Sequence, residues 1–407
     1  MKEVYIMTDR RTFIKRAGMI AAAAAMAPSG ILAGADSRSG QCGISSGRHC
    51  STGACSRKMT LEWEDFTARM KHTFSISGSS RDTTPIVLTR LHWNGLTGYG
   101  EASLPPYLPE TQASVRSYLK KVSEEVLPRF DDPFRIEDIL SETDSLMPGN
   151  TAAKASLDIA LHDLVGRIIG QPWWKIWGWD AAKTPYTCYT IGWDASDETV
   201  IGKTREASWS KILKVKLGRG DEQDRRMIRL IRSVNPDTPM FVDANQGWKD
   251  KEYALDMTWW LKEHGVVMIE QPMDKYDIDA HAWLTERSPL PVIADEACQR
   301  LSDVRRLYGA YSGINIKLMK CTGMREAREM VSLARAFGMR LMIGCMTETS
   351  VAISAAAQLS PAMEWADLDG NILIANDCFE GMRLDKGKIT LADIPGIGVE
   401  ALSPAMP

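Results

Sequence analysis

The chain has 407 residues, of which 44% are hydrophobic and 25% are charged, and its formal net charge is −3. This composition is typical of a soluble globular protein that has a sizeable core and two domains. The slight negative charge argues against a nucleic-acid partner, and the sequence has no basic tract and no zinc-type cysteine spacing.

The first 35 residues have the layout of an export signal. Arg10 and Arg11 begin a basic segment, and an apolar, alanine-rich run follows over residues 19–35. This pattern resembles a twin-arginine signal that is cleaved after Ala35. The run is short and is interrupted by a proline and a glycine, so we expect no stable membrane span after cleavage, and an uncleaved anchor is the alternative. The sequence therefore predicts an exported, periplasmic protein.

The remaining chain divides into four predicted parts. Residues 36–58 are rich in Ser and Gly without an apolar period, which predicts a flexible linker. Residues 59–184 contain strand patterns followed by helical ones, which predicts an α+β capping domain. In residues 185–375, eight short apolar segments alternate with helix-length segments, which predicts an α/β fold of the (β/α)8 TIM-barrel type. Residues 376–407 are expected to pack back on the front domain.

Acidic residues end three successive predicted strands of the barrel. Asp243, Glu270 and Asp295 are separated by 27 and 25 residues. Any one of them could be the N-cap of the following helix. Three carboxylates that converge at the mouth of a barrel would repel one another unless a cation joined them, and ligation by oxygen alone suits Mg²⁺. Asn245 and Glu296 lie just beyond two of these acids and are expected to support the ligands.

Lysines lie on the strands on either side of the acids. Lys214 and Lys216 alternate with apolar residues, so their side chains share one face of a strand, as they would also on a solvated edge strand. Two amines on opposite sides of a metal suit the removal of a proton next to a carboxylate, because one amine can take the proton and the other can return it. We expect Lys216 and Lys317 to be these bases. Lys214 is expected to keep Lys216 partly neutral and to reach the substrate carboxylate, and Lys320 to be solvated.

Several segments resemble, in the same order, the muconate-cycloisomerase branch of the enolase superfamily. They are GYGEAS, ASLDIALHDLVGRIIGQP, KVK, VDANQGW, IEQP, ADE and NIKLMKCTG. The resemblance runs from about Met59 to the end of the chain. It implies a modified, enolase-like barrel under a capping domain, with Mg²⁺ on the three acids and the two lysines as acid and base.

The segment DLDG at the end of the eighth predicted strand indicates the substrate. Asp367 and Asp369 resemble the Asp-x-Asp signature of dipeptide epimerases, in which the acids hold a free α-amino group. A strand places both side chains on one face, whereas a simple turn at Asp369 is the structural alternative. The side chain of the second substrate residue is expected near Thr190 and the capping loops. Arg81, or else Lys71, is the cation expected to meet a glutamate side chain.

The sequence thus predicts a Mg²⁺-dependent dipeptide epimerase that inverts the C-terminal α-carbon through an enediolate. Export favours L-Ala-D/L-Glu from murein peptides, and a hydrophobic dipeptide is an alternative. An N-acylamino-acid racemase or o-succinylbenzoate synthase is a rival, but its substrate has no ammonium group to bind. An exported barrel that only binds metal or peptide is a second rival, which would need neither lysine. The expected partner is the dipeptide alone, and a homo-oligomer is left open.

Overall fold

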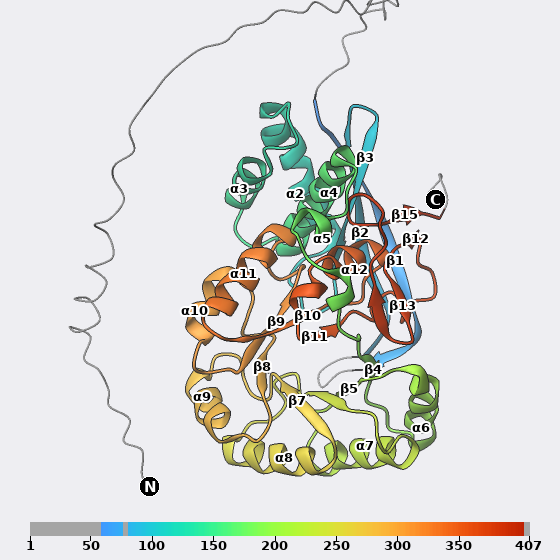
Figure 1. The fold of residues 1–407 in the computed structure, drawn as a ribbon, viewed down its shortest axis with the longest axis vertical. Coiled ribbons are helices and arrows are strands. Elements are labelled where there is room, and N and C mark those ends of the chain that lie inside the picture. The colour runs from blue at the N-terminus through green and yellow to red at the C-terminus, as the bar shows by residue number, and fades with distance from the viewer. Residues whose placement is uncertain (1–57, 76–79, 403–407) are drawn as a thin grey trace, which may run out of the picture. The chain divides into compact units, whose positions relative to one another are not determined.

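The structure is a computed structural model that describes residues 58–75 and 80–402 (Figure 1). The predicted signal at residues 1–35 and all but the last residue of the predicted linker at residues 36–58 lie outside the described residues. Within the described part, none of the helices combines the length and the apolar character needed to cross a membrane.

The front domain is a three-stranded antiparallel sheet covered by helices. Its strands are β1 (Thr60–Ser75), β2 (Ser80–Trp93) and β3 (Leu96–Ser103), and its helices are α2 (Gln112–Lys121), α3 (Ile136–Leu146), α4 (Thr151–Ile169) and α5 (Trp173–Ile176). An Asn94-Gly95 turn with positive φ at both residues joins β2 to β3, as expected of a two-residue hairpin. The α4 helix lies so close to β3 that a Cβ at Gly100 would lie 1.9 Å from Ser156 O.

Eight parallel strands form the barrel in the order β4 to β11. The strands are β4 (Tyr189–Ile191), β5 (Leu213–Lys216), β6 (Met240–Asp243), β7 (Val266–Glu270), β8 (Val292–Ala294), β9 (Gly313–Lys317), β10 (Arg340–Gly344) and β11 (Trp365–Asp367). A hydrogen bond of 3.0 Å from Cys188 N, the residue just before β4, to Ala366 O of β11 brings the two ends of the sheet together. The predicted fold class is therefore confirmed.

Helices connect successive strands of the barrel. They are α6 (Asp197–Glu206), α7 (Asp221–Val234), α8 (Lys251–Glu263), α9 (Ile278–Arg287), α10 (Leu301–Leu307), α11 (Met324–Ala336) and α12 (Ser350–Ala357). Over residues 368–402 no α-helix follows β11, so the eighth unit of the barrel lacks its helix. The chain returns instead to the front domain, where Ala375 N donates to Arg69 O at 2.8 Å and the ring of Phe379 lies 5.1 Å from that of Tyr99. This last part contains β12 (Phe379–Glu380), β13 (Arg383–Asp385), β14 (Lys388–Thr390) and β15 (Glu400–Ala401).

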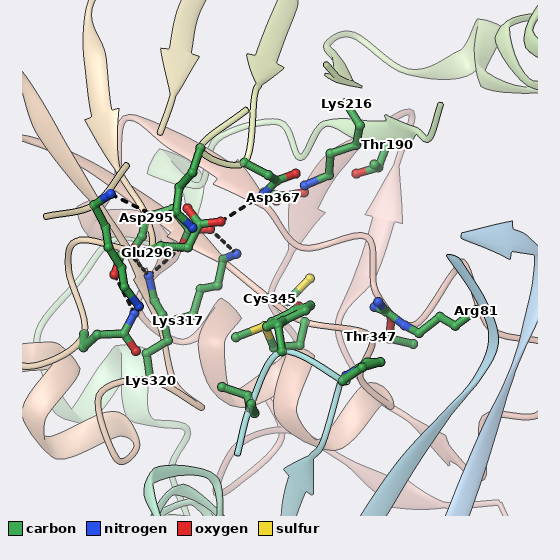
Figure 2. Close-up of a pocket in the computed structure, with 18 of the residues that line it drawn as sticks. Arg81, Thr190, Lys216, Asp295, Glu296, Lys317, Lys320, Cys345, Thr347 and Asp367 are labelled. Carbon is green, nitrogen blue, oxygen red and sulfur yellow. Dashed lines mark hydrogen bonds and ion pairs between the residues drawn. The ribbon is translucent and has the colours of Figure 1, made fainter. Parts of the chain in front are cut away.

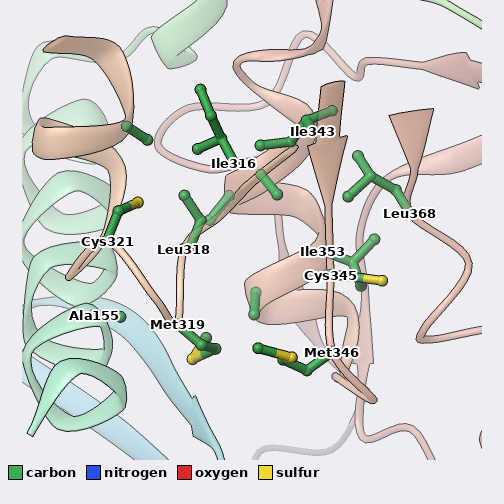
Figure 3. Packing of buried hydrophobic residues seen from close by; sticks show 14 of the residues in the cluster. Ala155, Ile316, Leu318, Met319, Cys321, Ile343, Cys345, Met346, Ile353 and Leu368 are labelled. Atoms are coloured by element: carbon green, nitrogen blue, oxygen red, sulfur yellow. The ribbon is translucent and has the colours of Figure 1, made fainter. Parts of the chain in front are cut away.

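Apolar packing on both faces of the barrel strands fixes their register. On the outside, Ile316 of β9 and Ile343 of β10 belong to the same core as Ile353 of α12 and Ala155 of α4 (Figure 3). On the inside, five buried side chains form a separate apolar layer: Cys188, Phe241, Met268, Ile293 and Met342. Alternate residues of a strand share a face. The residue two positions after each of these five therefore also points into the barrel, in the next layer toward the carboxyl ends of the strands.

Candidate active site

The acid triad forms the layer directly above the apolar one. Asp243 and Glu270 end β6 and β7 in register, and Asp295 follows β8. One carboxylate oxygen of each acid lies within 4.8 Å of the others, and all three side chains are buried. The structure therefore brings together the three acids that the sequence singled out.

Two lysines contact this triad from opposite sides. Lys216 Nζ lies 2.6 Å from Asp243 Oδ2, and Lys317 Nζ lies 2.8 Å from Asp295 Oδ2. Their strands, β5 and β9, are separated by four steps in a barrel of eight strands, so the two lysines lie across the barrel from each other. Both line a cavity of about 560 Å³ (Figure 2).

Burial and ion pairing oppose each other in this cluster. Burial would raise the pKa of Asp295, but Lys317 and Lys320 outweigh it and hold that pKa well below its usual range. Burial would lower the pKa of Lys317, but Asp295 and then Glu270 hold it well above the ordinary value. In Glu270, burial and the charge of Asp243 raise the pKa to about 7. At Glu270, therefore, the neighbouring lysines do not fully offset the negative charge of the triad.

The donor set fits a divalent cation. Three carboxylates converge without a nitrogen or sulfur ligand, which is the ligand chemistry of Mg²⁺. Two further buried oxygens at this place, Glu296 Oε2 and Asn245 Oδ1, have no hydrogen-bond partner among the described residues. Asn245 Nδ2 donates to Glu296 Oε1 at 3.2 Å, so the pair forms one polar wall beside the triad.

Two lysines have surroundings other than those predicted. Lys214 is fully buried and lies 2.6 Å from Asp367 Oδ2 and 2.7 Å from Glu270 Oε2. It neutralises these acids inside the barrel and is not among the residues that line the cavity, so its contact with a substrate carboxylate stays a prediction. Lys320 is not solvated, because its Nζ is bonded to Asp295.

The two acids of the DLDG segment line the same cavity. Asp367 ends β11 and accepts hydrogen bonds from Lys214 Nζ at 2.6 Å and Cys188 Sγ at 3.2 Å. Asp369 accepts a 2.7 Å hydrogen bond from Thr190 N. Burial and then the charge of Asp367 raise the pKa of Asp369 to about 7. Asp369 is therefore the acid whose charge is less fully neutralised.

Arg81 lies at the other end of the cavity, across from Asp295 and Glu296 (Figure 2). Its Nη2 donates to Thr347 Oγ1 at 2.9 Å, which joins β2 of the front domain to the turn after β10. Lys71, the other candidate cation, is exposed and does not line this cavity.

Sequence reasoning missed two residues that shape the site. Asn315 Nδ2 donates to Glu270 Oε1 at 2.7 Å, and its place two residues before Lys317 in one strand was a signal that it points inward. Tyr107 lines the cavity, and its hydroxyl lies 2.9 Å from Met346 Sδ. The sequence indicated its loop but not the residue.

Two family models cover most of the described chain. Residues 63–178 match the N-terminal domain of mandelate racemase / muconate lactonizing enzyme, and residues 201–404 match the enolase C-terminal domain-like model. The chain belongs to the enolase superfamily. Within this superfamily it groups with the dipeptide epimerases, and it is an isomerase of the racemase and epimerase class.

The proteins similar to this chain include dipeptide epimerases and a racemase. An L-Ala-D/L-Glu epimerase of Bacteroides thetaiotaomicron is 56% identical over 394 residues, which are 97% of this chain and 99% of that protein. A dipeptide epimerase of Enterococcus faecalis, solved with Mg and the dipeptide L-Leu-L-Tyr, is 28% identical with a TM-score of 0.78, covering 84% of this chain and 99% of the other. An N-succinyl Arg/Lys racemase of Bacillus cereus is 26% identical with a TM-score of 0.78, and the match covers 84% of this chain and 95% of the racemase.

Proposed function

We propose that this enolase-superfamily member is a Mg²⁺-dependent dipeptide epimerase that acts on L-Ala-D/L-Glu. The observation that carries the proposal is the position of Lys216 and Lys317 on opposite sides of one acid triad, in a cavity that also contains Asp367 and Asp369. The name of the Bacteroides relative and the Mg and dipeptide in the Enterococcus structure support it.

Substrate binding follows from the charges that line the cavity. Asp369, assisted by Asp367, attracts the free ammonium group of the first substrate residue. The substrate carboxylate then lies toward the triad, which places the α-carbon of the second residue between the two lysines. Asp243, Glu270 and Asp295 would hold Mg²⁺, which would offset the negative charge that develops on the substrate carboxylate as the α-proton leaves.

The two lysines invert the α-carbon. The lysine on the side of the α-proton, in its neutral form, takes that proton and becomes an ammonium group. A divalent cation on the triad would favour the neutral form, because it would offset the carboxylate charge that raises the pKa of Lys317. The opposite lysine, in its ammonium form, gives a proton to the other face and becomes neutral. One C–H bond breaks and one forms, so no proton is gained or lost overall. The same two groups in exchanged roles serve the other epimer.

Arg81 is proposed to select a glutamate side chain. Its guanidinium lines the cavity away from the triad, where the second residue's side chain would extend. A carboxylate is the natural partner of arginine because the guanidinium fork offers two parallel N–H donors. A hydrophobic dipeptide would offer this guanidinium no carboxylate.

Deuterium uptake from D₂O tests the proposed reaction. L-Ala-L-Glu, L-Ala-L-Leu and N-acetyl-L-Glu are incubated with the protein and Mg²⁺, and mass spectrometry and NMR locate the label. We expect label at the C-terminal α-carbon of L-Ala-L-Glu, together with the L-Ala-D-Glu epimer. Label in N-acetyl-L-Glu alone would favour a racemase of acylated amino acids, and no label in any compound would favour a binding protein.

A further inference from the structure

The turn after β9 buries a further lysine against the acid triad. Lys320 is 4% exposed, and its Nζ donates to Asp295 Oδ1 at 2.5 Å, to Asp295 O at 2.6 Å and to Asn315 O at 3.1 Å. An ammonium group has three N–H donors, so these bonds use all of them. Lys320 therefore has no hydrogen left for a substrate and differs in this respect from Lys317.

Contacts with the front domain fix the position of this turn. Lys320 N donates to Lys317 O at 2.9 Å, which folds the turn back toward its strand. At its far end, Met324 N donates to Asp158 Oδ1 of α4 at 2.5 Å. A Cβ at Gly323, where φ is +118°, would lie 2.3 Å from Asp158 Cγ, so the close approach requires glycine. The place of Lys320 is thus fixed independently of any ligand in the cavity.

Asp295 divides its two oxygens between two lysines. Lys320 occupies Oδ1, and Lys317 lies 2.8 Å from Oδ2 (Figure 2). We propose that Lys320 is a positioning residue that satisfies one oxygen of Asp295 and so leaves Lys317 free to turn to the substrate. This inference rests on the proposed role of Lys317 as a base.

The cost of an unpaired buried oxygen gives the reason. Without the Lys320 ammonium, Oδ1 of Asp295 would be a buried carboxylate oxygen that lacks its charged donor, which is unfavourable. The ammonium of Lys317 already lies on the same carboxylate, so it would be drawn across both oxygens and held away from the substrate. Loss of the Lys320 ammonium removes a positive charge beside the triad. The triad would therefore attract a divalent cation no more weakly than before.

Lys320→Met tests the inference, because methionine has a similar length and no charge. Lys262→Met is the matched control, since Lys262 is exposed on α8, and Lys317→Ala shows which epimer depends on Lys317. For each protein, Mn²⁺ binding is titrated by electron paramagnetic resonance, and α-deuterium uptake is measured separately for L-Ala-L-Glu and L-Ala-D-Glu. Lys320→Gln, which keeps two N–H donors but no charge, replaces the methionine variant if that variant does not fold.

We expect Lys320→Met to lower deuterium uptake about tenfold or more for the epimer that depends on Lys317, since hydrogen bonds to charged groups have this magnitude. The other epimer should exchange as in Lys262→Met, and Mn²⁺ should bind no more weakly. Equal losses for both epimers, or weaker Mn²⁺ binding, would overturn the inference and assign Lys320 to the fold or the triad.

Failure of the proposed function is distinguishable, because then the unsubstituted protein exchanges neither epimer. A crystal structure of Lys320→Met decides the inference in that case. Lys317 Nζ within hydrogen-bond distance of both Asp295 oxygens would support it, whereas Lys317 on Oδ2 alone would contradict it.

Discussion

Asp369 links the charge of the cavity to pH. Burial and the charge of Asp367 raise its pKa to about 7, so below that pH the carboxyl takes up a proton and loses the charge that attracts the substrate ammonium. We therefore predict that kcat/KM for L-Ala-L-Glu falls as the pH drops below about 7, because this parameter reports groups of the free enzyme. A pH series of kcat/KM measures it.

Asp369→Asn is the control for this pH dependence, since an amide does not titrate in this range. We expect the variant to lose roughly 10- to 100-fold in kcat/KM at alkaline pH, the magnitude of a lost charge-assisted hydrogen bond. Its kcat/KM should then lack the acidic limb. An unchanged limb in the variant would assign the titration to another group.

Arg81 is predicted to decide between a charged and an apolar second residue. Arg81→Met should lower kcat/KM for L-Ala-L-Glu by roughly 10- to 100-fold, because the side-chain carboxylate loses its charged partner. The value for L-Ala-L-Leu should change little, and Lys71→Met, outside the cavity, should alter neither. Equal losses for both dipeptides in Arg81→Met would mean that Arg81 supports the fold of the cavity and not its specificity.

For individual residues, the sequence predicted which side chains point into the barrel better than it predicted the groups that they contact. Asp243 and Lys216 could be found because each ends an apolar strand, and alternation then points both into the barrel. The burial of Lys214 and Lys320 could not be found, because it depends on depth within the barrel and on a turn that Asp158 holds from another domain. A lysine that follows a strand has the same sequence pattern whether it is solvated or buried.

Helix α4 packs very closely against β3 of the front domain. Gly100→Ala would place a Cβ 1.9 Å from Ser156 O, and we expect it to destabilise the protein by about 1–3 kcal/mol or more, as overpacking does. Gly202→Ala in α6, where a Cβ meets nothing within 4 Å, should stabilise it by about 0.5–1 kcal/mol. Relative to the unsubstituted protein, the urea unfolding midpoint should be lower for Gly100→Ala and higher for Gly202→Ala. A Gly100→Ala midpoint at or above that of the unsubstituted protein would refute the close approach.

The elements of the barrel were predictable for a physical reason. Strands of a parallel barrel are buried on both faces, so they appear in the sequence as short, largely apolar runs. The missing helix after β11 was not predictable in this way. It reflects the return of residues 371–376 to β1, where Lys71 N donates to Leu373 O at 2.9 Å, and pairing across such a distance in the chain leaves no local period.

For the whole molecule, the proposed export depends on the paired arginines near the N-terminus. Arg10→Lys combined with Arg11→Lys should keep the protein in the cytoplasm, because a twin-arginine signal is an address that its receptor reads. Lys15→Arg is the control and should be exported normally. Cell fractionation with immunoblotting measures both. Equal periplasmic amounts of the double variant and the control would contradict the proposal.

The arrangement of two lysines on opposite strands of one barrel is tested most directly by single-lysine variants. Lys216→Ala and Lys317→Ala are each given L-Ala-L-Glu and L-Ala-D-Glu in D₂O, and α-deuterium is followed by NMR. Each variant should exchange the α-proton of one epimer only, a different one for each variant, and neither should interconvert the epimers. Exchange of both epimers by either variant, or loss of the same epimer in both, would contradict the opposed placement of the two amines.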